Sequence, residues 1–164
     1  MTLSRTRWLA VVIAAVVATD WVIKGMVQHR LDVRVPHTVV DGWLSLFHTT
    51  NHGISWGTLS EVDAWWRFPL ITVLSVVGIA ALASVVRSSR DHWLRVAGAL
   101  VLGGAVGNFG DRLLNGGVTD YIYVHFFPFV FNFADIAITV GGVILAARML
   151  LERPADESAP AAES

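Results

Sequence analysis

The chain has 164 residues, of which 54% are hydrophobic and only 15% are charged, and its formal net charge is −1. Together with a positive mean hydropathy, this composition is too apolar for a soluble domain of this size and indicates an integral membrane protein. The nearly neutral charge excludes the basic surface that nucleic-acid binding requires. Because the chain has no cysteine, it has neither a disulfide nor a thiol nucleophile.

Four apolar segments are each long enough to cross a bilayer as a helix, which takes roughly 20 residues. We predict a mainly α membrane protein with four transmembrane helices, a small extracytoplasmic β-sheet and a short interfacial helix. The predicted spans are residues 8–27, 68–86, 93–114 and 129–151. The first segment also resembles a signal peptide, because Arg5 and Arg7 precede it and Ala18 offers a cleavage site. The apolar run continues past Ala18 and three spans follow, which favours a retained span.

The arginines set the predicted orientation of these spans. They flank the start of the first span, crowd the connection between the second and third, and close the fourth: Arg5, Arg7, Arg87, Arg90, Arg95, Arg148 and Arg153. By the positive-inside rule, both termini are then cytoplasmic. The connections 28–67 and 115–128 face outward, although Arg30, Arg34 and Arg67 on that side weaken the bias.

The first outer connection has a predicted structure of its own. Apolar and polar residues alternate from 31 to 35, and short strands at 38–40 and 43–47 are separated by Asp41-Gly42, which gives an outer β region at about 31–57. Ser60 begins a short helix that Trp65 and Trp66 anchor at the headgroup level. Residues 1–153 form one membrane domain, and we expect 154–164 to be a disordered cytoplasmic tail.

Three carboxylates converge on the outer end of the apolar part. Asp111 lies about 18 residues, or roughly 27 Å of helix, into the third span, Asp135 lies near the outer start of the fourth, and Asp120 lies in the short loop between them. An ionisable group within a membrane span is by default a hypothesis of a functional site. Two carboxylates in one low-dielectric site cannot both ionise easily, so one holds a proton while the other can act as a base towards water. This is the arrangement of an aspartic peptidase.

Each of these polar groups also has a structural interpretation. An adjacent acid and base at a helix end, such as Asp111 and Arg112, more often form an ion pair or a cap than a catalytic pair. Asn108 and Asn132 can satisfy backbone groups or each other. Asp120 and Asp135 can be buried acids of a packing network or a proton path.

Five sequence blocks make the pattern specific: Asp20 with Lys24, NHGISWG at 51–57, GGAVGNFGDR at 103–112, VTDYI at 118–122 and FNFAD at 131–135. In order and spacing they resemble the lipoprotein signal peptidase (signal peptidase II) family, over about residues 8–150. One departure is Ile23, where the family often has a small hydroxyl residue before the lysine. It puts a minor hydrogen bond in doubt, not the mechanism.

The resemblance implies an aspartic endopeptidase of the bacterial inner membrane, with its active site near the outer face. Such an enzyme removes signal peptides from prolipoproteins on the N-terminal side of a diacylglyceryl-modified cysteine. Asp120 and Asp135 match the catalytic dyad. The supporting polar or substrate-binding positions are matched by Asp20, Lys24, Asn51, Gly53, Asn108, Asp111, Arg112 and Asn132. The implied partners are lipidated precursors and membrane lipid, with no cofactor and no metal, and we expect a monomer.

Physical reasoning fits the same assignment. A substrate fixed to a diacylglycerol is held at the membrane surface, so its hydrolysis must occur there, and carboxylates in the hydrocarbon core would lie at the wrong depth. Polypeptide that unwinds for cleavage at the membrane also needs polar partners. Asn51, Asn108 and Asn132 are the predicted partners.

The sequence also permits three alternative functions. Lys24, the only lysine, can activate Ser55 in a serine–lysine dyad if its pKa is lowered. Asp20 lies four residues earlier on the same helix face and predicts a charged pair, which makes the lysine a poor base. A proton-coupled transporter would use Asp20, Asp111 and Asp135 as relay groups, and in a non-catalytic assembly factor the polar cluster would be structural.

Metal chemistry has weak support in the sequence. His48 and His52 are four residues apart, but their segment has a strand and turn pattern rather than a helical one. We therefore predict that none of the six histidines is a metal ligand.

Overall fold

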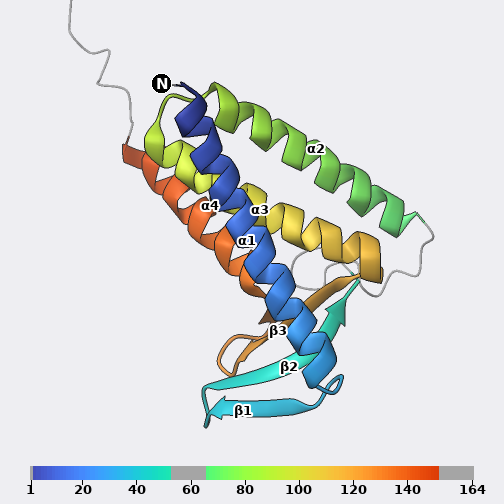
Figure 1. Ribbon diagram of the computed structural model, residues 1–164. Helices are drawn as coiled ribbons and strands as arrows, with labels where there is room; N and C mark the ends of the chain where they lie inside the picture. The colour runs from blue at the N-terminus through green and yellow to red at the C-terminus, as the bar shows by residue number, and fades with distance from the viewer. Residues whose placement is uncertain (1, 53–65, 152–164) are drawn as a thin grey trace, which may run out of the picture.

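A computed structural model describes residues 2–52 and 66–151. Its helices are α1 (Thr2–Arg30), α2 (Arg67–Ser88), α3 (His92–Asn115) and α4 (Phe133–Leu151). Its strands are β1 (Pro36–Val40), β2 (Leu44–Asn51), β3 (Val118–Val124) and β4 (Val130–Phe131). Figure 1 shows the helices side by side, with the sheet across the end opposite the N-terminus. The predicted class, a mainly helical membrane protein with a small sheet, is confirmed.

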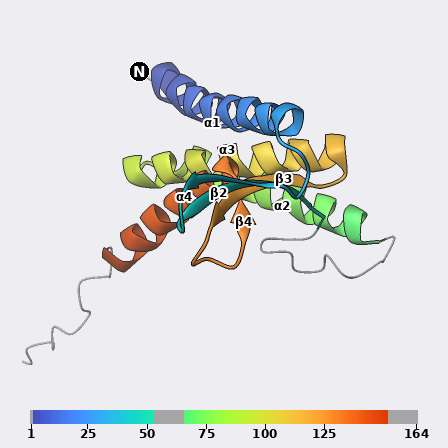
Figure 2. The same cartoon turned by 90° about the horizontal axis from the view of Figure 1, so that it is seen from below.

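Three of the four helices are long and apolar enough to cross a membrane by themselves. Among the described residues these are α1, α2 and α4. Helix α3 is also 24 residues long, but Asn108, Asp111 and Arg112 interrupt its apolar sequence. It packs against each of the other helices, and Figure 2 shows α3 between α1 and α2. The third predicted span is thus a helix whose three interrupting polar residues are buried or half-buried.

Small residues on α3 let its neighbours approach closely. A Cβ atom added to Gly103 would lie 2.7 Å from the Cβ of Val16 in α1, and one added to Gly104 would meet the carbonyl oxygen of Ala134 in α4. Ala97 and Ala99 have no exposed surface at all. Close backbone approach through small residues is the usual way in which helices pack within membranes.

The sheet is larger than predicted and has strands from both of the connections that were predicted to face outward. Its four strands are antiparallel in the order β1-β2-β3-β4, with Thr49 opposite Asp120 and Ile122 opposite Phe131. The prediction that Asp120 lies in a loop was therefore wrong, since it lies within β3. The fourth span begins at Phe133 rather than at 129, because Val130 and Phe131 pair with β3.

Two further expectations have different outcomes. Residues 31–35 are a turn rather than a strand, with Arg34 at a φ of 64° and the amide of Val35 donating to the Asp32 carbonyl. This turn leads from α1 into β1. The interfacial helix predicted from Ser60 and the tail 154–164 lie outside the described residues.

Candidate active site

The start of α4 is built by a reciprocal pair of hydrogen bonds between Asn132 and Asp135. The backbone amide of Asp135 donates to Asn132 Oδ1 at 3.0 Å, and the backbone amide of Asn132 donates to Asp135 Oδ2 at 3.2 Å. This is the geometry of a capping box, which satisfies amides that the first helical turn leaves without partners. The local sequence therefore fixes Asp135 in the first turn of α4, next to the sheet.

Asn132 also holds Asp120, which reaches the site from β3. The Nδ2 atom of Asn132 donates to Asp120 Oδ1 at 2.6 Å, and Asn51 Nδ2 donates to Asp120 Oδ2 at 3.1 Å. Asn108 Nδ2 donates to Asp135 Oδ1 at 2.8 Å. Each of the four carboxylate oxygens of Asp120 and Asp135 thus accepts a hydrogen bond. The two predicted dyad residues share one partner, Asn132, which has no exposed surface.

A buried charge cluster lies behind the two carboxylates. Lys24 Nζ is 2.8 Å from Asp20 Oδ2, 3.4 Å from Asp111 Oδ2 and 2.8 Å from Asn108 Oδ1. The other oxygen of Asp20 accepts the backbone amide of Ala134 at 3.0 Å. The predicted charged pair between Asp20 and Lys24 is confirmed, and it joins α1 to both α3 and the start of α4.

Asp111 organises the chain that leads into β3. Its carboxylate accepts the backbone amide of Thr119 at 2.6 Å and Asn115 Nδ2 at 2.6 Å. Gln28 Nε2 of α1 donates to the hydroxyl of the same threonine at 2.7 Å. Because Thr119 precedes Asp120, these bonds fix the strand from which the Asp120 carboxyl projects. Asp111 therefore connects the end of α3 to the start of β3.

Burial changes the protonation chemistry of β3. Burial, reinforced by the negative charge of Asp135, raises the pKa of Asp120 to about 7, against the opposing hydrogen bonds from Asn132 and Asn51. Burial also raises the pKa of Tyr121 to about 12. The neutral Tyr121 hydroxyl accepts the backbone amide of Phe133 at 3.1 Å. It thereby fastens β3 to the start of α4.

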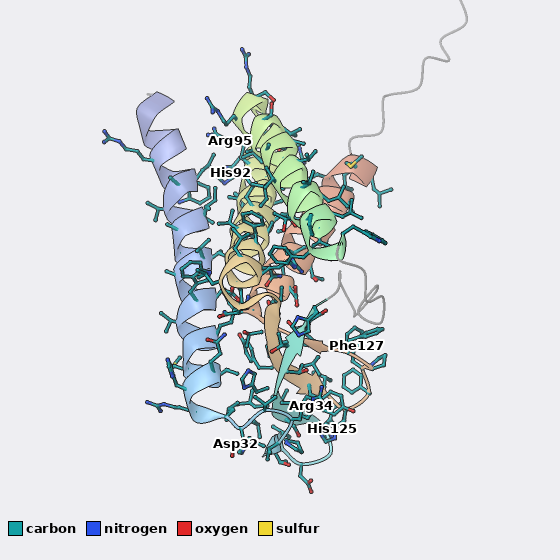
Figure 3. The ribbon with its side chains drawn as sticks, turned by 90° about the vertical axis from the view of Figure 1, so that its right-hand side faces the viewer. Asp32, Arg34, His92, Arg95, His125 and Phe127 are labelled. Carbon is teal, nitrogen blue, oxygen red and sulfur yellow. The ribbon has the colours of Figure 1, made fainter. Side chains whose placement is uncertain are left out.

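A cavity of about 560 Å³ opens beside the two carboxylates. Asn51, Asn108, Arg112, Asp120 and Asp135 line its polar part. The rest of the wall is mostly apolar and comes from β3, β4, their connection and α4: Val118, Val124, Phe126, Phe127, Val130, Phe131, Ile136, Ile138, Thr139 and Val140. Figure 3 shows Phe127 at the side of the sheet end. The cavity can hold an apolar molecule with a polar group at the carboxylates.

A second cavity of about 430 Å³ lies among α2, α3 and α4. Asn108, Arg112, Asp135 and Ile138 border both cavities. Arg112 also interacts electrostatically with three acids, Asp111, Asp120 and Asp135. Apolar space therefore reaches Asp135 from two sides.

The structure brings together all but one of the predicted site residues. Gly53, like Ser55 of the rival dyad, lies outside the described residues. His48 Nδ1 is 3.2 Å from the Leu31 carbonyl and His52 Nδ1 is 3.1 Å from the Gly116 carbonyl.

The sequence did not predict four residues whose hydrogen bonds hold β3 in place beside the helices: Gln28, Asn115, Thr119 and Tyr121. Thr119 and Tyr121 flank Asp120 in the VTDYI block, so that block was a signal for two of them.

Comparisons with known proteins identify the family. The sequence model of the family described as signal peptidase (SPase) II matches residues 12–151. The chain is 37% identical to a lipoprotein signal peptidase of Pseudomonas syringae pv. tomato, over 95% of this chain and 92% of that protein. It is 36% identical to the lipoprotein signal peptidase of Pseudomonas aeruginosa, over 94% of each chain.

Solved structures agree on the fold. Two structures described as a bacterial membrane enzyme, obtained by the in meso method at 1.9 and 2.3 Å resolution, superpose with TM-scores of 0.79 and 0.78. Each is 23% identical in sequence. The first covers 88% of this chain and 94% of its own, and the second 90% and 93%. Because the family model and the relatives each span most of the chain, the protein belongs to the signal peptidase II family.

Proposed function

We propose that the protein is an aspartic endopeptidase that removes signal peptides from prolipoproteins, with Asp120 and Asp135 as its catalytic dyad. The names of its relatives supply the substrate class. The observation that carries the assignment is that two carboxylates at the wall of one cavity both accept hydrogen bonds from Asn132. Catalytic carboxylates are expected where burial and a like charge separate the pKa values of two acids.

The proposed reaction begins with one proton shared by the dyad. The ionised carboxyl takes a proton from a water molecule, and the water oxygen attacks the carbonyl carbon of the scissile peptide bond. The protonated carboxyl donates its proton to the carbonyl oxygen, which gives a tetrahedral intermediate with two hydroxyl groups. The carboxyl that took the proton from water then gives it to the nitrogen as the C–N bond breaks, and one hydroxyl of the intermediate returns its proton to the other carboxyl. The products are a new carboxyl on the signal peptide and a free amine on the cysteine. Because the two acids share one proton in this proposal, neither is assigned a fixed role.

The apolar cavity wall supports a lipidated substrate. A diacylglyceryl group on the cysteine would keep the scissile bond at the membrane surface, and the cavity is lined both by the two carboxylates and by apolar side chains such as Ile136 and Ile138. We place the dyad near the outer face of the bacterial inner membrane, with both termini in the cytoplasm. We also propose that residues 1–153 act as one domain and that the protein is a monomer without a cofactor or metal.

The rival mechanisms have weaker support. Lys24 lies between two carboxylates, and a lysine that is held as an ammonium ion is a poor base for Ser55. Asp20 and Asp111 both bond to backbone amides, which is the behaviour of groups that hold a structure together. A proton relay instead needs carboxyl groups that follow a path across the membrane.

The test is a cleavage assay with purified protein in lipid bilayers. The substrate is a precursor peptide that carries a diacylglyceryl cysteine, and mass spectrometry of the products locates the cut. We expect cleavage immediately before the cysteine, and a loss of at least about tenfold in kcat/KM with the unlipidated peptide. Equal cleavage of both peptides would refute the role of the lipid, and no cleavage of either would refute the proposed function.

A further inference from the structure

Lys24 lies at a junction of three acceptors and is almost completely buried, with 3% of its surface exposed. Its Nζ atom contacts oxygens of Asp20, Asp111 and Asn108. An ammonium group has three protons to donate and no acceptor. The three contacts therefore match its full donor capacity, and only Asn108 among them is a neutral group.

The side-chain amide of Asn108 links this junction to the dyad. Its Oδ1 atom accepts hydrogen bonds from Lys24 Nζ at 2.8 Å and from Asn132 Nδ2 at 3.1 Å. Lysine can only donate, so it forces the amide to turn its oxygen towards α1. The Nδ2 atom of Asn108 then faces Asp135 and donates to its Oδ1 at 2.8 Å.

We propose that Lys24 is a positioning residue for the catalytic dyad, whose ammonium group fixes the orientation of the Asn108 amide and thereby holds a hydrogen-bond donor on Asp135. This inference rests on the proposed function and goes beyond it. It assigns to α1 a part in catalysis that acts through Asn108 and needs no contact with the substrate. The pair of Lys24 with Asp20 remains a separate link between helices.

Charge gives the same residue a second, measurable effect. The charged groups around this path are Asp20 of α1, Asp111 and Arg112 of α3, Asp120 of β3 and Asp135 of α4. The positive charge of Lys24 lowers the pKa of Asp120, against the larger effect of burial. A neutral residue at position 24 should therefore move the pH profile of kcat towards higher pH, which a purely structural role would not do.

The test is a double-mutant cycle in which every protein carries Asp20→Asn. With Asp20 already neutral, Lys24→Met leaves only Asp111 without its cation, rather than both carboxylates. Four proteins are compared in bilayers with the lipidated peptide: Asp20→Asn alone, and with Lys24→Met, Asn108→Leu or both. We expect Lys24→Met to lower kcat by at least about tenfold, as for one lost hydrogen bond to a charged group, and to shift the pH profile upward. In the protein that already carries Asn108→Leu, adding Lys24→Met should lower kcat by less than about threefold further.

The inference would be overturned if Lys24→Met and Asn108→Leu lowered kcat by independent factors that multiply in the combined protein, and if Lys24→Met left the pH profile of kcat unchanged. Asn108→Asp, in the otherwise unchanged protein, tests it where the Lys24→Met proteins do not fold. Aspartate keeps the acceptor for Lys24 but has no N–H for Asp135, so kcat should again fall at least about tenfold. A wild-type kcat in that variant would refute the inference.

Controls separate this inference from the proposed function. Asp91→Asn alters the pair with Arg148, whose atoms are 2.6 Å apart, at the other end of the helices, and it should leave kcat and the pH profile unchanged. Asp120→Asn and Asp135→Asn are assayed beside the cycle. Cleavage by those two variants would refute the proposed dyad, whereas their inactivity together with an uncoupled cycle would refute only the role of Lys24.

Discussion

Asn132 forms hydrogen bonds to three separate parts of the chain through one side chain. Its oxygen accepts the amide of Asp135, and its nitrogen donates to Asp120 and to Asn108. The structural interpretation, that the two asparagines satisfy backbone groups or each other, is confirmed. The same bonds hold the two carboxylates at the cavity. The contacts of Asn132 therefore serve both the folded structure and the proposed catalysis.

The protonation of Asp120 predicts how activity depends on pH. Its pKa of about 7 means that the dyad holds its proton below neutral pH and loses it as the pH rises through 7. We expect kcat to fall on the alkaline side, approaching about tenfold per pH unit. The measurement is kcat for the lipidated peptide across a pH series. A kcat that stays level or rises well above pH 7 would contradict this assignment.

Ser55 and Lys24 distinguish the two peptidase mechanisms. If the carboxylates activate water, Ser55→Ala should keep activity within about threefold of wild type, because no step uses the hydroxyl. Lys24→Ala should reduce the amount of folded protein, since an unpaired buried charge costs about 3–5 kcal/mol, and adding Asp20→Asn should partly restore folding. Loss of activity in Ser55→Ala, with a trapped acyl-enzyme, would instead favour the serine mechanism.

At the scale of elements, the sequence predicts helices better than strands. Apolar runs of about 20 residues identify a membrane helix almost by themselves, and α2 and α3 end within two residues of the predicted bounds. Strands β3 and β4 are short and flanked by aromatic residues, so their local pattern resembles a connection and the start of a helix. The sheet exists because β2 and β3 pair across a long sequence separation, which a local pattern does not show.

The candidate site is predictable from the sequence in its residues but not in its connections. The pairing of Asp120 with Asp135 follows from the resemblance of the motifs to the signal peptidase II family, whereas the residues alone show only three acids that converge on one end. The bond from the Ala134 amide to Asp20 joins residues 114 positions apart, and neither spacing nor periodicity indicates such a partner. The hydrogen bond from the Phe133 amide to the Tyr121 hydroxyl likewise depends on the tertiary packing and cannot be predicted from local sequence.

Two neighbouring glycines of α4 test how this helix packs on α3. A Cβ atom at Gly141 would lie 2.6 Å from the carbonyl oxygen of Ala97, whereas at Gly142 it would meet nothing within 4 Å. Gly141→Ala should destabilise the protein by about 1–3 kcal/mol through overpacking. Gly142→Ala should be neutral or stabilising by up to about 1 kcal/mol, because alanine favours a helix. Thermal unfolding of both variants measures this difference, and equal stabilities would contradict the packing described for α3 and α4.

On the scale of the whole molecule, polar and charged residues lie at both ends of the helices. Figure 3 shows His92 and Arg95 at one end of the helices, and Asp32, Arg34 and His125 at the sheet end. The apolar lengths of α1, α2 and α4 separate these ends. The site lies at the sheet end, where Asp120 comes from β3 and Asp135 from the start of α4, and this depth suits hydrolysis at a membrane surface.

The proposed orientation can be tested directly, because the chain has no cysteine of its own. A single cysteine is introduced by His37→Cys in β1 or by Ser88→Cys at the end of α2. A maleimide that does not cross membranes should label position 37 in intact spheroplasts, and position 88 only after permeabilisation. Labelling in the opposite pattern would place the site on the cytoplasmic side.

The central claim is that Asp120 and Asp135 together activate water for cleavage of a lipidated precursor. The most direct measurement is the turnover of the lipidated peptide by purified Asp120→Asn and Asp135→Asn in bilayers, with thermal unfolding to confirm that each is folded. Asparagine has nearly the same shape but cannot act as a base, so each variant should lose at least about a thousandfold in kcat. Turnover at the wild-type rate by either folded variant would contradict the aspartic mechanism.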